Sequence, residues 1–374
     1  MSKTITNILS QKLQSRAERG LLRNLRTADG LVDFCSNDYL GFARDGAFQF
    51  TLKQLAIDYA DEQTGATGSR LLVGNTHIAE EVEAEIAAIH KAEAGLIFNS
   101  GYDANLGLFG CIADQGDTIL YDELVHASIH DGLKLSKANN IAFKHNDLAD
   151  LEEKLKQVHG QAFVAVESVY SMDGDLALLS EISFLCETYN AALIVDEAHA
   201  TGFVGTTGLG LVNHLGMEDK CFARLHTFGK SLAVHGAIIL GSHTLRNYLT
   251  NYARSFIYST ALPPMAYRQI RAAYRYMLIN PQKIEQLTSL IEYYREKTKG
   301  LNYEVLDSPS AIQGIVVPGN AEVRQLAKML EENVFDIRPI VSPTVPKGAE
   351  RIRICLHAFN TTQEVDRLVA LLSQ

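Results

Sequence analysis

Lys230 has a sequence context in which a lysine could do covalent chemistry. It lies in HTFGKSLAVHGAIIL, residues 226–240, between a small-residue turn and an apolar run that ends at Gly241. A lysine held at the mouth of a sheet loses hydration, which disfavours the ammonium ion and gives the lowered pKa that an imine-forming lysine needs. A single lysine in such a turn is more often a solvated surface residue. The catalytic interpretation therefore depends on finding its partners.

The segment AALIVDEAHA supplies two of them. Asp196 follows the apolar run, and a carboxylate at the end of a buried strand is costly unless a cation faces it. A protonated pyridine nitrogen is such a cation, and His199 could reach a phenolic oxygen on the same ring. Asp196, His199 and Lys230 together indicate a pyridoxal phosphate site, with counter-ion, oxygen partner and imine lysine. The alternative for Asp196 is a helix-capping aspartate.

Two other chemistries fit the same stretches less well. VDEAH resembles the metal-binding motif of P-loop helicases, but a Walker A loop needs glycine five residues before Gly229, where Arg224 stands. The two motifs also occur in reversed order. His126 and His130 are four residues apart, but no HExxH pattern surrounds them, so we expect no metal site.

Apolar runs separated by helical patterns fill the middle of the chain. We expect an amphipathic helix over 4–25 and another over 77–92. Short runs that alternate with helices are typical of a mostly parallel sheet covered on both faces, and therefore of an α/β fold. The runs are GLIFN, DTILY, AFVAVESV, AALIVD, FARLHTF and GAIIL.

The pattern changes at Pro263. One long helical stretch runs to about Lys299, followed by strand-like LNYEVLD and AIQGIVV, a helix, the strand RIRICL and a final helix. We expect an N-terminal helix and short strand over 1–36, a large domain over 37–262 and a smaller α+β domain over 263–374. No low-complexity linker separates these parts, so they should be packed together.

Composition limits the class of protein. The chain has 374 residues, 47% of them hydrophobic, with a net charge of −10 that argues against a nucleic-acid partner. The N-terminal stretch MSKTITNILSQKLQS has no apolar core of a signal peptide, and no run has the length of a membrane span. The cysteines lack CxxC spacing and are odd in number, which favours reduced thiols and a cytoplasmic protein. They are Cys35, Cys111, Cys186, Cys221 and Cys355.

Polar groups follow several of the apolar runs. Ligands of an open α/β sheet bind outside the carboxyl ends of its strands. Ser100-Gly101-Tyr102 follows GLIFN and opens a helix, whose free amides would suit a phosphate; the alternative is an ordinary N-cap serine. His126 follows DTILY, although a single histidine is more often structural.

In this order, the segments resemble the α-oxoamine synthases, pyridoxal-phosphate enzymes of fold type I, from about Leu22 to Leu372. The resemblance implies that Lys230 in TFGKSLA carries the cofactor, Asp196 meets the pyridinium and His199 the phenolic oxygen. His126 in HAS would stack on the ring. It also implies a homodimer with active sites at the subunit interface. The other implied cofactor contacts are Ser100, Gly101, Tyr102, Glu167, Ser171 and Thr227, with Ser259 and Thr260 reaching the phosphate of the neighbouring subunit.

The resemblance also assigns substrate contacts. Asn37 in SNDYLGF and Arg353 in RIRIC would meet the substrate, with Arg353 clamping the amino-acid carboxylate and Arg23 a weaker second contact. From the residues alone, Arg351 and Arg353 share the strand face opposite Ile352, and a bidentate guanidinium suits a carboxylate. The alternative is two solvent-facing arginines.

HASIHDG followed by KHNDLADLE is most similar to the branch that condenses L-alanine with a pimeloyl thioester, carried on coenzyme A or acyl carrier protein, in biotin biosynthesis. In that reaction Lys230 would take the Cα proton. Three features depart from the family pattern: Ser231-Leu232-Ala233 after the lysine, His235 where serine is common, and a short stretch before Asn37. The alternatives are a sibling synthase that uses glycine or serine, a transaminase, and a catalytically silent homologue that serves as a binding partner.

Overall fold

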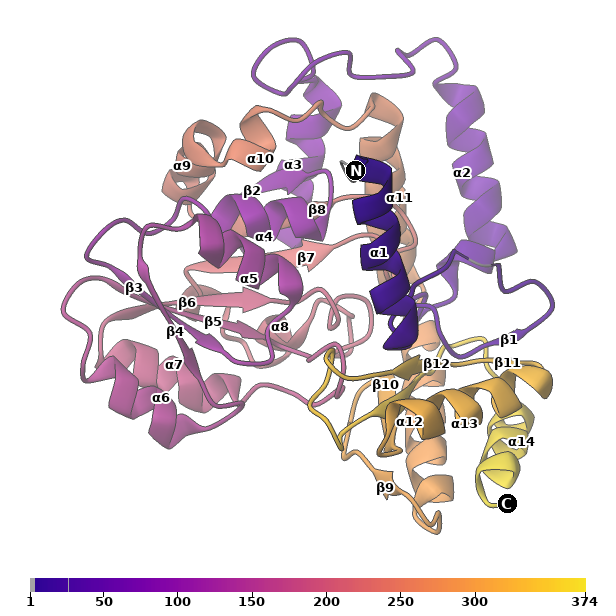
Figure 1. The fold of residues 1–374 in the computed structure, drawn as a ribbon. Helices are drawn as coiled ribbons and strands as arrows, with labels where there is room; N and C mark the ends of the chain where they lie inside the picture. The colour runs from indigo at the N-terminus through magenta and orange to yellow at the C-terminus, as the bar shows by residue number, and fades with distance from the viewer. Residues whose placement is uncertain (1–3, 26) are drawn as a thin grey trace.

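A seven-stranded sheet forms the centre of the computed structural model, which describes residues 4–25 and 27–374 (Figure 1). The strand order is β2-β8-β7-β6-β5-β3-β4. Within this sheet β8 runs opposite to the other six strands, which confirms the predicted mostly parallel arrangement. The strands are β2 (Ala94–Phe98), β3 (Thr118–Asp122), β4 (Asn139–Phe143), β5 (Ala162–Glu167), β6 (Ala191–Asp196), β7 (Ala223–Thr227) and β8 (Ala237–Gly241).

Helices cover both faces of this sheet. Neighbouring residues of one strand serve opposite faces: Phe163 packs in one apolar cluster and Val164 in the other. This is why the strands read as continuous apolar runs. The first cluster includes α4 (Gly101–Phe109), α5 (Ala127–Leu135), α9 (His243–Tyr252) and α10 (Arg254–Ile257); the second includes α6 (Leu148–Leu155), α7 (Leu179–Thr188) and α8 (Leu211–His214).

The C-terminal part forms a four-stranded antiparallel sheet with helices beside it. The short strand β1 (Val32–Asp33) pairs in parallel with β11 (Phe335–Asp336), so a segment near the N-terminus joins this C-terminal part. The other elements are β9 (Glu304–Val305), β10 (Ile312–Val316), β12 (Arg338–Ile340), β13 (Arg351–Cys355), α12 (Gln282–Thr298), α13 (Asn320–Glu332) and α14 (Thr362–Leu372).

One apolar cluster extends from the central sheet into the C-terminal part. It contains Ile238 of β8, Leu287 of α12 and Ile352 of β13, all fully buried. A shared core of this kind agrees with packed rather than tethered domains. The division into 1–36, 37–262 and 263–374 stays a proposal; residues 1–3 and 26 of its first segment lie outside the described residues.

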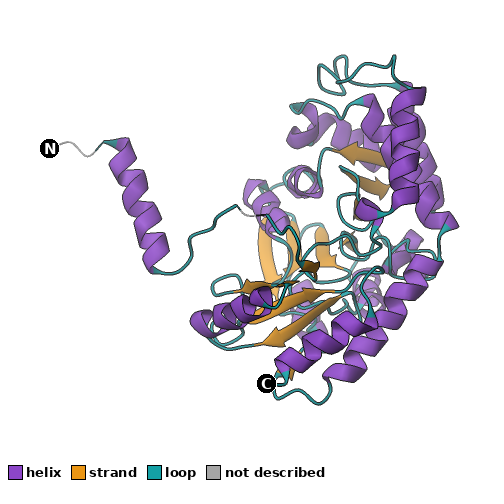
Figure 2. Cartoon of the chain, turned by 90° about the vertical axis from the view of Figure 1, so that its right-hand side faces the viewer, coloured by secondary structure: helices purple, strands orange, loops and turns teal. Residues whose placement is uncertain are grey.

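The predicted helix over 4–25 is wrong in extent. The helix α1 (Ile5–Glu18) ends before Gly20, whose φ of 64° lies in the left-handed region that commonly follows a helix end. Leu21 and Leu22 therefore fall outside it. All residues of α1 are exposed, and Figure 2 shows the helix standing apart from the rest of the chain.

The predicted single helical stretch from Pro263 to Lys299 is also wrong. It is two helices, α11 (Pro264–Ile279) and α12, separated at Asn280 and Pro281, because proline disfavours helical backbone in the residue before it. The helix α11 packs on α3 (His77–Ile89) and on α2 (Gly46–Asp58), which we did not predict. Short 3₁₀ helices form at η1 (Phe42–Arg44) and η2 (Glu218–Lys220).

The state of the cysteines and the character of the helices bear on the expectations that were drawn from composition. All five cysteines are free thiols, as predicted, and Cys186 and Cys355 are buried. Among the described residues, no helix combines the length and apolar character that crossing a membrane requires.

Candidate active site

A cavity of about 290 Å³ opens at the carboxyl ends of the central strands. Because the carboxyl ends of the parallel strands meet at one edge of the sheet, most of the predicted side chains come together there, as expected for an open α/β sheet. Its lining residues are Asn37, Ser100, Gly101, Tyr102, Asn105, His126, Ser128, Glu167, Asp196, Ala198, His199, Thr227, Gly229, Lys230, His235 and Gly236.

Lys230 enters this cavity from the loop between β7 and β8. The loop is closed by its own backbone, with the Phe228 amide donating to the Gly236 carbonyl at 2.9 Å and the Val234 amide to the Phe228 carbonyl at 3.0 Å. Burial lowers the pKa of Lys230 to about 8, although Asp196 and Glu167 favour its charged form. A substantial fraction of this lysine is therefore a neutral nucleophile near neutral pH.

This pKa predicts how cofactor-free protein reacts with an aldehyde. Because only the neutral amine attacks, the rate at Lys230 should rise about tenfold per pH unit and level off above about pH 8. Stopped-flow absorbance with pyridoxal phosphate measures this rate. The rate of a Lys230→Ala variant gives the background from other lysines, which is subtracted. A rate that still rises tenfold per unit at about pH 9.5, as for an ordinary lysine, would contradict the lowered pKa.

Asp196 is the last residue of β6 and is 5% exposed. Its Oδ2 accepts from Asn105 Nδ2 at 2.7 Å and its Oδ1 from the Ala198 amide at 2.9 Å. The carboxylate is thus fixed by neutral donors, leaving its charge to be matched by a cation in the cavity. The helix-cap alternative explains only the bond to Ala198.

Glu167 ends the neighbouring strand, in register with Asp196. Burial, and next the charge of Asp196, raise the pKa of Glu167 well above its usual value. Its Oε1 is buried and has no hydrogen-bond partner among the described residues. A buried polar atom of this kind is costly unless a bound group or water completes it.

His199 is buried beside Lys230. Its Nδ1 lies 2.8 Å from the Tyr39 hydroxyl, which donates to Asn37 Oδ1 at 3.1 Å. Burial, aided by the charge of Lys230, lowers the pKa of His199 well below its usual value. The imidazole is therefore neutral and held in one orientation.

The N-terminus of α4 forms another wall. Ser100 caps the helix by accepting from the Asp103 amide at 3.1 Å, and the first amides after such a cap have no partner within the helix. A Cβ on Gly101 would lie 2.5 Å from Thr227 Cγ2, so only glycine allows this approach. The free amides and the nearby Thr227 hydroxyl are suitable donors for a phosphate.

His126 caps α5 and also faces the cavity. Its Nδ1 is 2.7 Å from Ser128 Oγ. Desolvation is the main reason that the pKa of His126 is lowered. A neutral ring is suited to stacking on an aromatic ligand, because it adds no charge to the cavity.

Arg353 and Ser171 are not among the residues that line the cavity. Arg353 Nε donates to the Ser171 carbonyl at 2.7 Å, and its Nη2 to Asn37 Oδ1 at 3.1 Å. The alternative of two solvent-facing arginines is wrong, because Arg351 is 6% exposed and forms an ion pair with Asp173. Asn37 connects Arg353 to the cavity.

Three predicted contacts lie away from this cavity within one chain. Arg23 is exposed in the coil after α1. Ser259 and Thr260 line a separate small cavity, where the Thr260 carbonyl accepts from Asn99 Nδ2 at 2.9 Å. Since the resemblance gives Ser259 and Thr260 to a neighbouring subunit, their assignment stays a prediction.

Sequence reasoning missed residues that orient the predicted ones. Asn105 follows Gly101 by four positions on one helix, a spacing that places both on the same face and was visible in NSGYDAN. Tyr39 lies two residues after Asn37, but its contact with His199 joins positions 160 apart and leaves no local signal. Ser128 and His235 complete the lining without having been assigned to it.

The residues present fit pyridoxal phosphate. Asp196 would meet a protonated ring nitrogen, Lys230 the aldehyde carbon, and the α4 amides with Thr227 the phosphate. The unpartnered Glu167 Oε1 and the close approach of Gly101 to Thr227 are the observations that support this fit. Among the described residues, no group of three or more histidine, cysteine or acidic side chains is placed to hold a metal ion.

Known proteins resemble this chain over nearly its whole length. An 8-amino-7-oxononanoate synthase of Emericella nidulans is 42% identical over 397 residues, covering 98% of this chain and 95% of that protein. Another, of Lysinibacillus sphaericus, is 38% identical and covers 96% of this chain and 95% of that protein.

Solved structures confirm the fold-type-I prediction. An 8-amino-7-oxononanoate synthase from Francisella tularensis is 27% identical, with a TM-score of 0.79 over 92% of this chain and 97% of that one. A serine palmitoyltransferase of Sphingomonas wittichii is 25% identical, with a TM-score of 0.89 over 98% of this chain and 95% of that one. The family model of class I and II aminotransferases matches residues 29–372. The chain therefore belongs to the aminotransferase class I and II family.

Proposed function

We propose that the chain uses pyridoxal phosphate to condense L-alanine with a pimeloyl thioester, giving 8-amino-7-oxononanoate, carbon dioxide and the free thiol, a step of biotin biosynthesis. The observation that carries this proposal is the convergence of Lys230, Asp196, His199 and His126 on one cavity. The shared name of the two relatives supports the product. Those names also favour a synthase over a transaminase.

Each cavity residue has a role in this proposal. Bound pyridoxal phosphate supplies an electron sink for the carbanion formed at the amino-acid Cα. Lys230, whose pKa burial lowers to about 8, would bind the cofactor and take the Cα proton. Asp196 would keep the ring nitrogen protonated, His199 would form a hydrogen bond with the ring oxygen, and His126 would stack on the ring.

The overall reaction needs no external oxidant or reductant. The Cα of L-alanine forms a bond to the acyl carbon as the thiolate leaves, the former carboxyl departs as carbon dioxide, and Cα regains a proton. The raised pKa of Glu167 reduces the negative charge that would repel the substrate carboxylate. Arg353, linked to the cavity through Asn37, is proposed to bind that carboxylate.

Replacing Arg353 with lysine should raise the KM for the amino acid roughly 10- to 100-fold, because an ammonium cannot form the two parallel bonds of a guanidinium. The KM for the acyl thioester should change little. Steady-state kinetics with each substrate varied in turn measures both constants. An equal rise in both would show that Arg353 does not bind the amino acid selectively.

The sibling reaction with glycine or serine is the second candidate, and it is favoured by the structural likeness to serine palmitoyltransferase. L-alanine and glycine differ by one methyl group, which is worth only about 1–3 kcal/mol of discrimination. Titrating the visible absorbance of the cofactor-loaded protein with L-alanine, glycine and L-serine separates the two. A band shift with L-alanine alone supports our proposal, whereas a shift with glycine or L-serine alone supports the sibling.

We also propose a cytoplasmic homodimer with Ser259 and Thr260 completing the partner's phosphate site. Two features support the dimer: these residues lie outside their own chain's cavity, and Ile5, Leu9 and Leu13 of α1 are 74%, 55% and 56% exposed. Exposed apolar side chains on one helix favour burial against another chain. Analytical ultracentrifugation should give twice the chain mass, and a monomer at all concentrations would contradict the dimer.

A further inference from the structure

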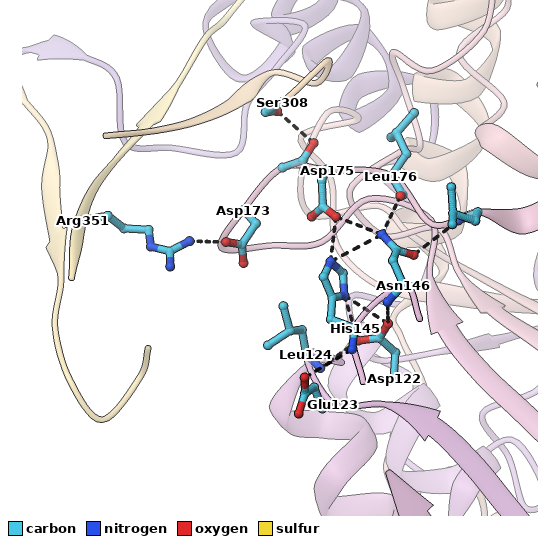
Figure 3. Close-up of polar contacts among 12 residues, drawn as sticks. Asp122, Glu123, Leu124, His145, Asn146, Asp173, Asp175, Leu176, Ser308 and Arg351 are labelled. Carbon is cyan, nitrogen blue, oxygen red and sulfur yellow. Dashed lines mark hydrogen bonds and ion pairs between the residues drawn. The ribbon is translucent and has the colours of Figure 1, made fainter. Parts of the chain in front are cut away.

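The turn over residues 170–176 joins the central sheet to the C-terminal part (Figure 3). Val169 bridges to Leu176, and inside the turn the Gly174 amide donates to the Tyr170 carbonyl at 2.8 Å. Gly174 has a φ of 76°, and a Cβ there would lie 2.1 Å from the Ile312 carbonyl oxygen. The turn is thus packed directly against β10.

On the C-terminal side, the turn holds Arg353. The Ser171 carbonyl accepts from Arg353 Nε at 2.7 Å, and Asp173 forms an ion pair with Arg351. The Gly174 carbonyl accepts from Ser308 Oγ at 2.8 Å. A displacement of this turn would therefore move the carbonyl that fixes the Arg353 guanidinium.

On the sheet side, His145 and its neighbour Asn146 hold the turn. His145 Nδ1 lies 3.0 Å from both carboxylate oxygens of Asp122, the fully buried last residue of β3, and its Nε2 lies 2.7 Å from Asp175 Oδ2. Asn146 adds bonds from its Nδ2 to Asp175 Oδ2 at 3.1 Å and to the Leu176 carbonyl at 3.0 Å. Figure 3 shows these contacts on both sides of the imidazole.

The charge state of this histidine supports a strong bridge. Burial opposes its protonation, but the hydrogen bonds to Asp122 and Asp175 outweigh burial and raise the pKa of His145 to about 10. At neutral pH the ring is an imidazolium that donates from both nitrogens to carboxylates, and charge-assisted hydrogen bonds of this kind are roughly twice as strong as neutral ones. Asp122, His145 and Asp175 are all absent from the cavity lining.

We propose that His145 is a positioning residue for the amino-acid substrate: by bridging Asp122 to Asp175 it fixes the turn over 170–176, and through the Ser171 carbonyl it orients Arg353. This inference rests on the proposed function, which assigns the substrate carboxylate to Arg353. Losing the bridge loosens the grip on the amino acid and leaves the cofactor contacts intact.

The test compares His145→Gln with His159→Gln, a matched change at an exposed histidine. Absorbance titration of the cofactor-loaded proteins with L-alanine should give an apparent Kd that is roughly 10-fold higher for H145Q and unchanged for H159Q. The affinity for pyridoxal phosphate should stay within about twofold of wild type. In the cofactor-free protein, the amides of Tyr170 and Gly174 should exchange with deuterium faster in H145Q only.

Combining His145→Gln with Arg353→Ala separates positioning from a general loss of structure. If His145 acts through Arg353, adding His145→Gln to the R353A variant leaves its Kd for L-alanine unchanged. Multiplying effects, or an unchanged Kd in H145Q, would overturn the inference. If H145Q does not fold, Asp175→Ala removes the acceptor on the turn side of the same bridge and carries the same expectations.

Failure of the proposed function would give a different experimental result from failure of this inference alone. A wild-type protein whose absorbance responds to no amino acid would contradict that function, and with it this inference. A wild-type response to L-alanine with equal affinity in H145Q would overturn the inference alone. A response to glycine or L-serine instead leaves the inference testable with that amino acid.

Discussion

Replacing Lys230 with alanine is expected to lower kcat on the order of 10³-fold or more. The variant loses both the amine that binds the cofactor covalently and the base for the Cα proton, and a positioned base alone is worth roughly 10²–10⁴-fold. The side chain is suited to both roles because burial lowers its pKa to about 8. Initial rates with L-alanine and a pimeloyl thioester measure the loss.

The same variant should lose its covalent link to the cofactor. Borohydride reduction followed by peptide mass spectrometry should add pyridoxyl phosphate to Lys230 in the wild type and to no lysine in the variant. Lys328→Ala, at a side chain that is 76% exposed, is the matched control and should behave as wild type. A Lys230→Ala variant that retained most of its activity would contradict the proposed mechanism.

Replacing Asp196 with asparagine is expected to lower kcat roughly 10²–10³-fold, the usual cost of removing one preorganised electrostatic partner of a transition state. Asparagine has one acceptor oxygen in place of two, so it keeps the bond from Asn105 or the bond from the Ala198 amide and loses the charge. The ring nitrogen then loses the group that keeps it protonated, and the electron sink weakens. The KM for L-alanine should change far less than kcat.

The exposed Asp219→Asn variant is the matched control and should keep the kcat of the wild type. Activity of D196N within tenfold of wild type would show that Asp196 is not the ring-nitrogen partner.

The sequence predicted the central sheet because its strands are buried on both faces and read as continuous apolar runs. Asp196, Glu167 and Asp122 end three of these strands, so their convergence at one edge followed from topology. In contrast, the end of α1 at Glu18 depended on a backbone conformation at Gly20 that periodicity does not reveal.

Other features depend on contacts between distant segments. Nothing in RIRIC indicates that Arg353 donates to the Ser171 carbonyl, 182 positions away. The pairing of Val32 with Phe335 likewise joins opposite ends of the chain through a two-residue strand, too short for a periodic signal. His145 stands in the segment KHNDLADLE, but its bridge to Asp175 becomes visible only in the fold.

The most direct test of the proposed reaction follows the carboxyl carbon of the amino acid. L-alanine labelled with ¹³C at the carboxyl would be incubated with the cofactor-loaded protein and pimeloyl-coenzyme A or pimeloyl-acyl carrier protein. The proposal predicts labelled carbon dioxide and unlabelled 8-amino-7-oxononanoate in equal amounts, detected by mass spectrometry. Retention of the label in an organic product, or no product from either thioester, would contradict it.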